Sequence, residues 1–178
     1  MTLLASRRSI ALLSIAAGLA GTCVPVRAWA DDACAAFKWN VAHERALFAT
    51  QPLKESAGRD AASATRIRRD RLYRVRLIPE EKVSFAATPG KRTPTEGTYA
   101  GVVLLHLAAA GTYRVSLSQR FWVDVVKDGK IISSEAFTGA HGCNAPRKVV
   151  QYRLPAGNVL LQISGEASPE VELAVTRP

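Results

Sequence analysis

Histidine and cysteine are scarce in this chain, with three residues of each type among 178. The histidines, His43, His106 and His141, are widely separated and form no His-x-His pair. Only His141 and Cys143 lie close together, and a tetrahedral metal site needs four ligands. The composition therefore predicts no metal site and no cofactor.

Long hydrophobic runs are missing outside the first 30 residues. There, Arg7 and Arg8 precede the uncharged apolar run 10–20, and a small-x-small motif ends at Ala30. This order of basic, apolar and small residues predicts a signal peptide at 1–30 that is cleaved on export. The arginine pair leaves open whether export is the ordinary unfolded kind or the twin-arginine kind.

The rest of the chain, 31–178, has the length of one domain with its own core. No stretch in it reaches the roughly 18–20 apolar residues that span a bilayer. We therefore expect a periplasmic or secreted protein of one domain, without a transmembrane segment after cleavage.

Cleavage of the signal peptide removes Cys23 and leaves two cysteines, Cys34 and Cys143. An even pair in an oxidising compartment predicts a disulfide. The alternative is a reactive or metal-bound thiol at Cys143 beside His141.

Acidic residues are too few to balance the basic ones, at 15 against 24. The signal peptide holds three of the basic residues and no acidic one, so the mature chain keeps a net charge of +6. An excess of positive charge favours anionic partners. Outside the cytoplasm these are an anionic glycan, a lipid headgroup or an acidic protein rather than nucleic acid.

Short runs rich in β-branched and aromatic residues alternate with turn signals through most of the chain, after one helix predicted at 33–49 with Asp32 as its N-cap. Asp128-Gly129 is the strongest turn signal, because a type I′ hairpin needs positive φ at both central residues. This cadence predicts a mainly β fold, a β-sandwich or jelly roll of about eight or nine strands. The predicted strands are 72–78, 82–87, 98–107, 112–117, 121–126, 130–137, 148–154, 159–164 and 171–176.

A cluster of arginines is the strongest local asymmetry of charge. Alternation along 72–78 places Arg74 and Arg76 on one face, about 7 Å apart, where their planar guanidinium groups would bind carboxylate or phosphate bidentately. The alternative is a solvated edge strand that its charges protect from aggregation.

The loop 139–148 carries a second set of polar side chains between two predicted strands. Sandwich loops often hold binding groups, so His141, Asn144 and Arg147 are candidate ligand contacts. Trp122 is the aromatic candidate, with a core tryptophan as the alternative. No nucleophile elbow accompanies Ser133 and His141, so no catalytic residue is predicted.

Three strand-and-turn motifs, at 111–117, 122–130 and 154–163, resemble the bacterial pre-peptidase C-terminal type of β-sandwich found in secreted proteins. The resemblance implies an accessory module that binds sugars, protein surfaces or calcium. The motifs at 36–40 and 44–48 are similar to those of short exported proteobacterial proteins sometimes named homogentisate dioxygenase. That name implies an iron site of two histidines and a carboxylate, which the separated histidines do not supply.

The sequence therefore predicts an exported, non-catalytic binding module for an anionic ligand, a polysaccharide or an envelope protein. Two alternatives remain open at this point. One is a metal-dependent exported enzyme of the dioxygenase type, and the other is a structural subunit of an envelope complex.

Overall fold

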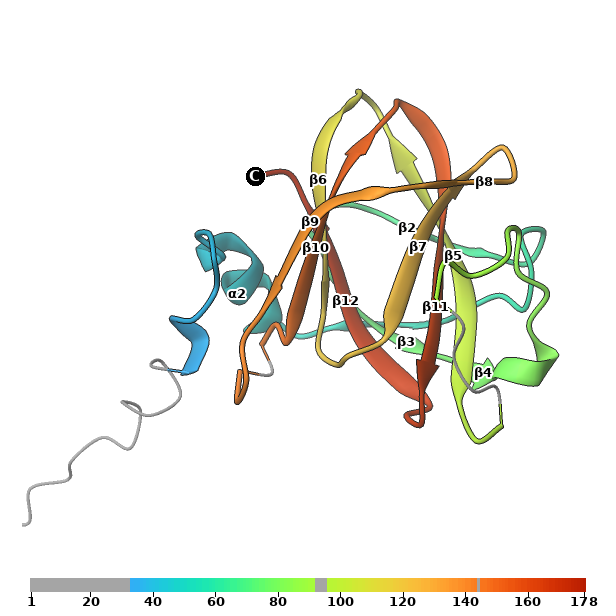
Figure 1. The fold of residues 1–178 in the computed structure, drawn as a ribbon, viewed down its shortest axis with the longest axis horizontal. Coiled ribbons are helices and arrows are strands. Elements are labelled where there is room, and N and C mark those ends of the chain that lie inside the picture. Colours follow the sequence, from blue (N-terminus) through green and yellow to red (C-terminus); the bar gives the residue numbers. More distant parts are fainter. Residues whose placement is uncertain (1–32, 92–95, 144) are drawn as a thin grey trace, which may run out of the picture.

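The computed structural model describes residues 33–91, 96–143 and 145–178. The predicted signal peptide, Asp32 and Asn144 lie outside the described residues. Two six-stranded sheets face each other, which confirms the predicted β-sandwich (Figure 1). The single-domain organisation stays a prediction.

Sheet A has the order β1-β3-β12-β6-β10-β9. All its pairings are antiparallel except the parallel pair of β1 and β3. Its strands are β1 (Leu53–Ser56), β3 (Leu72–Arg76), β6 (Gly111–Leu117), β9 (Ser134–Gly139), β10 (Lys148–Leu154) and β12 (Glu170–Thr176).

Sheet B has the order β2-β5-β11-β7-β8, with β4 paired to β5. Again one edge pair, β2 with β5, is parallel. Its strands are β2 (Thr65–Ile67), β4 (Ile78–Pro79), β5 (Tyr99–Leu107), β7 (Trp122–Lys127), β8 (Lys130–Ile132) and β11 (Gly157–Glu166).

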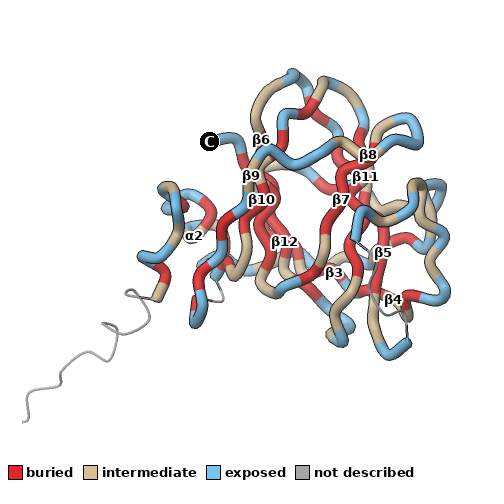
Figure 2. Tube along the Cα trace, viewed as in Figure 1, coloured by how far each residue is buried: buried red, intermediate tan, exposed pale blue. Residues whose placement is uncertain are grey.

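The core lies between the two sheets and is made of alternate residues of the longer strands (Figure 2). Val115 and Leu173 of sheet A, for example, are fully buried together with Leu105 and Leu161 of sheet B. Apolar burial of this kind supplies most of the stabilisation of such a fold. The outward-facing residues of the same strands are therefore the ones that can contact a ligand or partner.

The described part of the chain holds twelve strands, more than the eight or nine predicted. Short polar segments form β1, β2 and β4, which pair with distant strands and carry no alternating pattern of their own. The predicted strand 130–137 is two strands, because the chain crosses from sheet B to sheet A at Ser133. The predicted hairpin is confirmed, with φ of 50° at Asp128 and 73° at Gly129.

The predicted strand 82–87 is wrong, since this segment pairs with neither sheet and follows a 3₁₀ helix at Glu80–Lys82. Its backbone groups are satisfied by other partners. The N–H of Ser84 donates to the carbonyl of Arg59, and Ala87 exchanges two hydrogen bonds with the side chain of Gln162. The segment therefore lies over the outer face of sheet B.

Helix α2 (Ala42–Phe48) is shorter than the predicted 33–49. The side chain of Asn40 accepts from the N–H of Ala42, and the N–H of Lys38 donates to Thr138 of β9, so residues before Ala42 follow a different path. The helix packs on the outer face of sheet A (Figure 1). There the buried carboxylate of Glu44 accepts from the hydroxyl of Thr176 at 2.8 Å.

Candidate functional site

The two sheets separate along the side where β7 faces β9 and β10. Strand β8 pairs with β7 only from Val125 to Lys127. Within the described chain, the preceding residues of β7 have no strand partner on the side away from β11. Unpaired edge groups need other partners.

Two side chains of β10 supply those partners. The hydroxyl of Tyr152 donates to the carbonyl of Val123 at 2.8 Å, and the ammonium of Lys148 donates to the carbonyl of Phe121 at 2.9 Å. Burial raises the pKa of Tyr152, so its hydroxyl remains a donor. The sheets are thus linked here by side chains rather than by strand pairing, and space remains between them.

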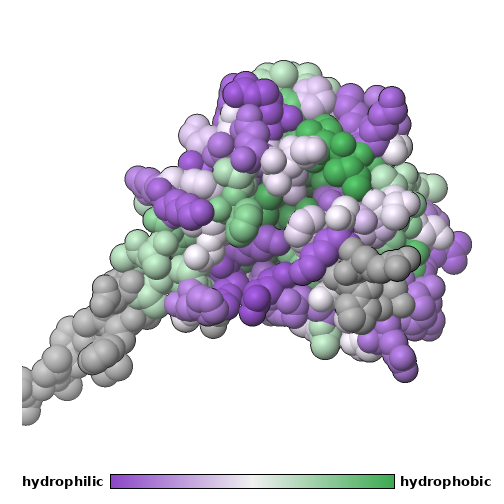
Figure 3. All heavy atoms as spheres, viewed as in Figure 1, coloured by the Kyte–Doolittle hydropathy of each residue, from purple (hydrophilic) through white to green (hydrophobic). Residues whose placement is uncertain are grey.

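An apolar cavity of about 360 Å³ lies at this separation. Figure 3 shows hydrophobic side chains gathered over β8 and the adjoining part of β7, on the face toward the viewer. The lining of the apolar cavity is mostly aromatic and aliphatic, and includes Trp122, Val123, Ile131, Ile132, Phe137 and Val150.

A polar cavity of about 530 Å³ adjoins the apolar cavity. The two share Trp122, Phe137 and Lys148 in their linings, so they adjoin one another, and together they are called the depression. Their volumes are in the range of small-molecule pockets, about 300–1,000 Å³. The charged lining of the polar cavity consists of Lys91, Arg120, Arg147, Lys148 and one carboxylate, Glu166, with His141 beside them.

Trp122 stands at the junction of the two cavities and outside the core cluster, so the core-tryptophan alternative is wrong. Its indole N–H donates to Asp124 at 2.9 Å, and the other oxygen of that carboxylate accepts from the N–H of Gly90. The ammonium groups of Lys148 and Lys91 lie 5.2 and 5.9 Å from the centre of its ring. These contacts fix the ring and place positive charge against it.

The pKa of Lys148 is held below its ordinary range. Burial of the ammonium is the largest cause, and the nearby positive charge of Lys91 adds to it. Asp124 and Glu166 act in the opposite direction without cancelling the effect. A cation in this state gains from the approach of an anion.

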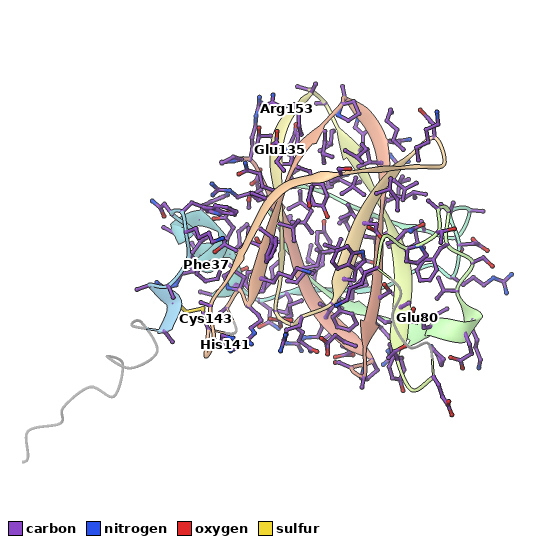
Figure 4. The ribbon with its side chains drawn as sticks, in the orientation of Figure 1. Phe37, Glu80, Glu135, His141, Cys143 and Arg153 are labelled. Atoms are coloured by element: carbon purple, nitrogen blue, oxygen red, sulfur yellow. A yellow bond between two sulfur atoms is a disulfide. The ribbon has the colours of Figure 1, made fainter. Side chains whose placement is uncertain are left out.

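The predicted disulfide is present and joins Cys34 to Cys143, so the alternative of a free thiol is wrong. It fixes the middle of the loop 139–148, where His141 lies close to it (Figure 4). The guanidinium of Arg147 donates to the carbonyl of Ala140 at 3.0 Å and lies 3.4 Å from His141. Of the predicted site residues, Trp122, His141 and Arg147 therefore share one depression.

Arg74 and Arg76 lie elsewhere, on the outer face of sheet A, and share a face as predicted. Strand β3 is internal, between β1 and β12, so the interpretation as an edge strand is wrong. Arg74 donates to Glu172 of β12 at 2.8 Å, which raises the pKa of the guanidinium. Arg76 is opposite Glu170 in the same register.

Sequence analysis missed Lys91, Arg120 and Phe137 as site residues. Phe137 is 64% exposed, and alternation along β9 alone gives no reason to expect an aromatic facing solvent. Lys91 is in a loop, and only the fold brings it to Trp122. Arg120 lies two residues before Trp122, and this proximity in sequence was the available signal.

The histidines have separate surroundings. His43 lies 3.1 Å from Asp70, and His106, which is exposed, lies 2.8 Å from Asn158. Among the described residues, no group of three or more histidine, cysteine or acidic side chains is arranged to hold a metal ion, and no helix is long and apolar enough to cross a membrane. No protein-family model matches the chain and no curated protein matches it, so function is inferred from the geometry alone.

Proposed function

We propose that this protein is an exported, non-catalytic binding module for an anionic ligand, and that the ligand binds in the polar cavity. The observation that carries the proposal is the lining of that cavity, which has four cationic side chains against one carboxylate. Two of the cations lie against Trp122. Export is supported by the predicted signal peptide and agrees with the disulfide.

The cations come from three separate segments of the fold. Lys91 follows the segment over sheet B, and Arg120 precedes β7. Arg147 and Lys148 are adjacent, at the end of the loop 139–148 and the start of β10. Like charges gathered by folding repel one another, and a bound anion relieves that repulsion. The guanidinium groups among these four cations would bind a carboxylate or phosphate through two parallel hydrogen bonds.

The non-catalytic part of the proposal rests on where the nucleophile candidates lie. Ser133 and Ser134 line the apolar cavity, whereas His141 lines the polar cavity and faces Arg147. The resemblance to accessory sandwich modules agrees with binding rather than catalysis.

Binding of polygalacturonate, an anionic polysaccharide, tests this proposal by calorimetry at low salt. The double variant Lys91→Gln/Arg120→Gln removes two exposed cations from the cavity. Two exposed ion pairs at about 0.7 kcal/mol each correspond to a roughly tenfold loss of affinity. Neutral dextran should not bind.

The matched control is Arg74→Gln/Arg76→Gln, which removes the same charge from the outer face of sheet A. Its affinity should equal that of the unchanged protein. Equal losses in the two double variants would show that only net charge matters, and would contradict a site in the polar cavity. Absence of polygalacturonate and short-chain carboxylate binding would overturn the proposed function itself.

A further inference from the structure

The depression has two ends of opposite character. The apolar cavity reaches between the sheets, where Val123 and Val150 form part of its lining. The polar cavity opens beside Arg147 of the loop 139–148 and Arg120 of the β6–β7 connection. In Figure 3 a band of hydrophilic side chains runs directly below the hydrophobic patch. A single ligand that fits both ends must itself have two ends.

Phe137 stands on the shared boundary of the two cavities and is 64% exposed. Only one other large hydrophobic side chain of the described chain, Leu53, is similarly exposed. An apolar patch with a polar rim is typical of a ligand-binding groove, and Phe137 adjoins the apolar lining at its cationic rim. Phe137 thus extends the apolar wall out to the cationic rim.

An added peptide strand does not fit this place. The carbonyls of Phe121 and Val123 at the edge of β7 already accept from Lys148 and Tyr152. Strand addition needs such edge groups for its own ladder of hydrogen bonds. The depression therefore favours a ligand recognised through its apolar surface and its charge.

We propose that the ligand is an anionic amphiphile, with its acyl chain in the apolar cavity and its carboxylate or phosphate head in the polar cavity. This inference rests on the proposed function and names the class of ligand. Trp122 and Phe137 contact the ligand where head and chain meet, and Lys148 lies at the same point. The charge of the head matches the four cations, and the chain matches the apolar lining.

Calorimetric titration of the purified, oxidised protein with four probes tests the inference. Decanoate and hexanoate share a head and differ in chain length. Decyl phosphate tests a phosphate head, and decyltrimethylammonium has the same chain with opposite charge. Each buried methylene strengthens binding about fourfold, so we expect decanoate to bind at least about tenfold more tightly than hexanoate.

Two variants assign the ends of the ligand. Ile131→Ser changes a partly exposed side chain that lines the apolar cavity and not the polar one, and should weaken decanoate several-fold while leaving polygalacturonate unchanged. Lys91→Gln/Arg120→Gln should weaken both ligands. Decyltrimethylammonium should not bind.

Equal affinities for decanoate and hexanoate, or binding of decyltrimethylammonium as tight as decanoate, would overturn the amphiphile. Polygalacturonate binding that persists in that case would leave the proposed function intact. A tighter complex with decyl phosphate than with decanoate would support a phosphate-headed lipid as the source of the ligand, and the reverse order a free fatty acid.

Discussion

Lys148 takes part in three interactions at once, and each has a different consequence. Its ammonium donates to the carbonyl of Phe121, lies against the ring of Trp122 and lines both cavities. The first interaction satisfies the edge of β7, while the other two place charge where the ligand head would lie. One residue therefore joins the stability of the edge to the chemistry of the site.

The lowered pKa of Lys148 predicts a pH dependence of anion binding. Because its pKa is lowered, the ammonium of Lys148 loses its proton at a lower pH than an ordinary lysine, whose pKa is 10.5. Affinity for polygalacturonate should therefore fall as pH rises from neutral toward 10.5. In Lys148→Arg the charge persists to much higher pH, so the fall should be smaller.

The surrounding groups Lys91, Arg120, Asp124 and Glu166 are present in both proteins, and therefore serve as the internal control. Calorimetry at a series of pH values compares the two. Identical declines would contradict a role for the charge of Lys148.

At the scale of single residues, part of the candidate site follows from the sequence. His141 and Arg147 were predictable because a polar loop between strands often binds ligands. For Trp122, a binding role was only one of two interpretations, since alternation does not say which face of a strand is the core. Lys91 and Phe137 became site residues only through long-range contacts, which no local pattern reports.

At the scale of elements, the crossing between β8 and β9 leaves the first residues of β7 without a partner from β8, and the apolar cavity lies there. Strand β8 ends at Ile132 and β9 begins at Ser134, so one residue connects two sheets. The sequence predicts a single strand here, because no glycine, proline or asparagine separates the two halves. The hairpin at Asp128-Gly129 was predictable from the turn alone, since few residues accept positive φ.

The disulfide is the second element that shapes the site. It joins residues 109 apart in sequence and holds the loop 139–148 near the N-terminal segment. A chain-entropy estimate for a loop of this length gives as much as about 4–5 kcal/mol. Cys34→Ala/Cys143→Ala should therefore lower the free energy of unfolding in urea by up to that amount.

The control for this measurement is a reducing agent. It should lower the urea midpoint of the unchanged protein and leave that of the double variant unaltered. A double variant as stable as the oxidised parent would contradict a stabilising role for the disulfide.

At the scale of the whole molecule, two sheets share a core on one side and separate on the other. The excess of positive charge noted in the sequence is divided between places with different surroundings. On the outer face of sheet A, Glu172 and Glu170 oppose Arg74 and Arg76. In the polar cavity the cations outnumber the acidic side chains, so the fold rather than the composition sets where the proposed anion site lies.

The central claim is that an anionic ligand binds where the sheets separate. Titrating the isotope-labelled protein with decanoate and following its amide and indole signals by NMR tests this most directly. The account predicts that the largest shifts occur in β7, β9 and the start of β10, and include the indole N–H of Trp122. Shifts centred on β3 around Arg74 and Arg76, or no shifts at all, would contradict it.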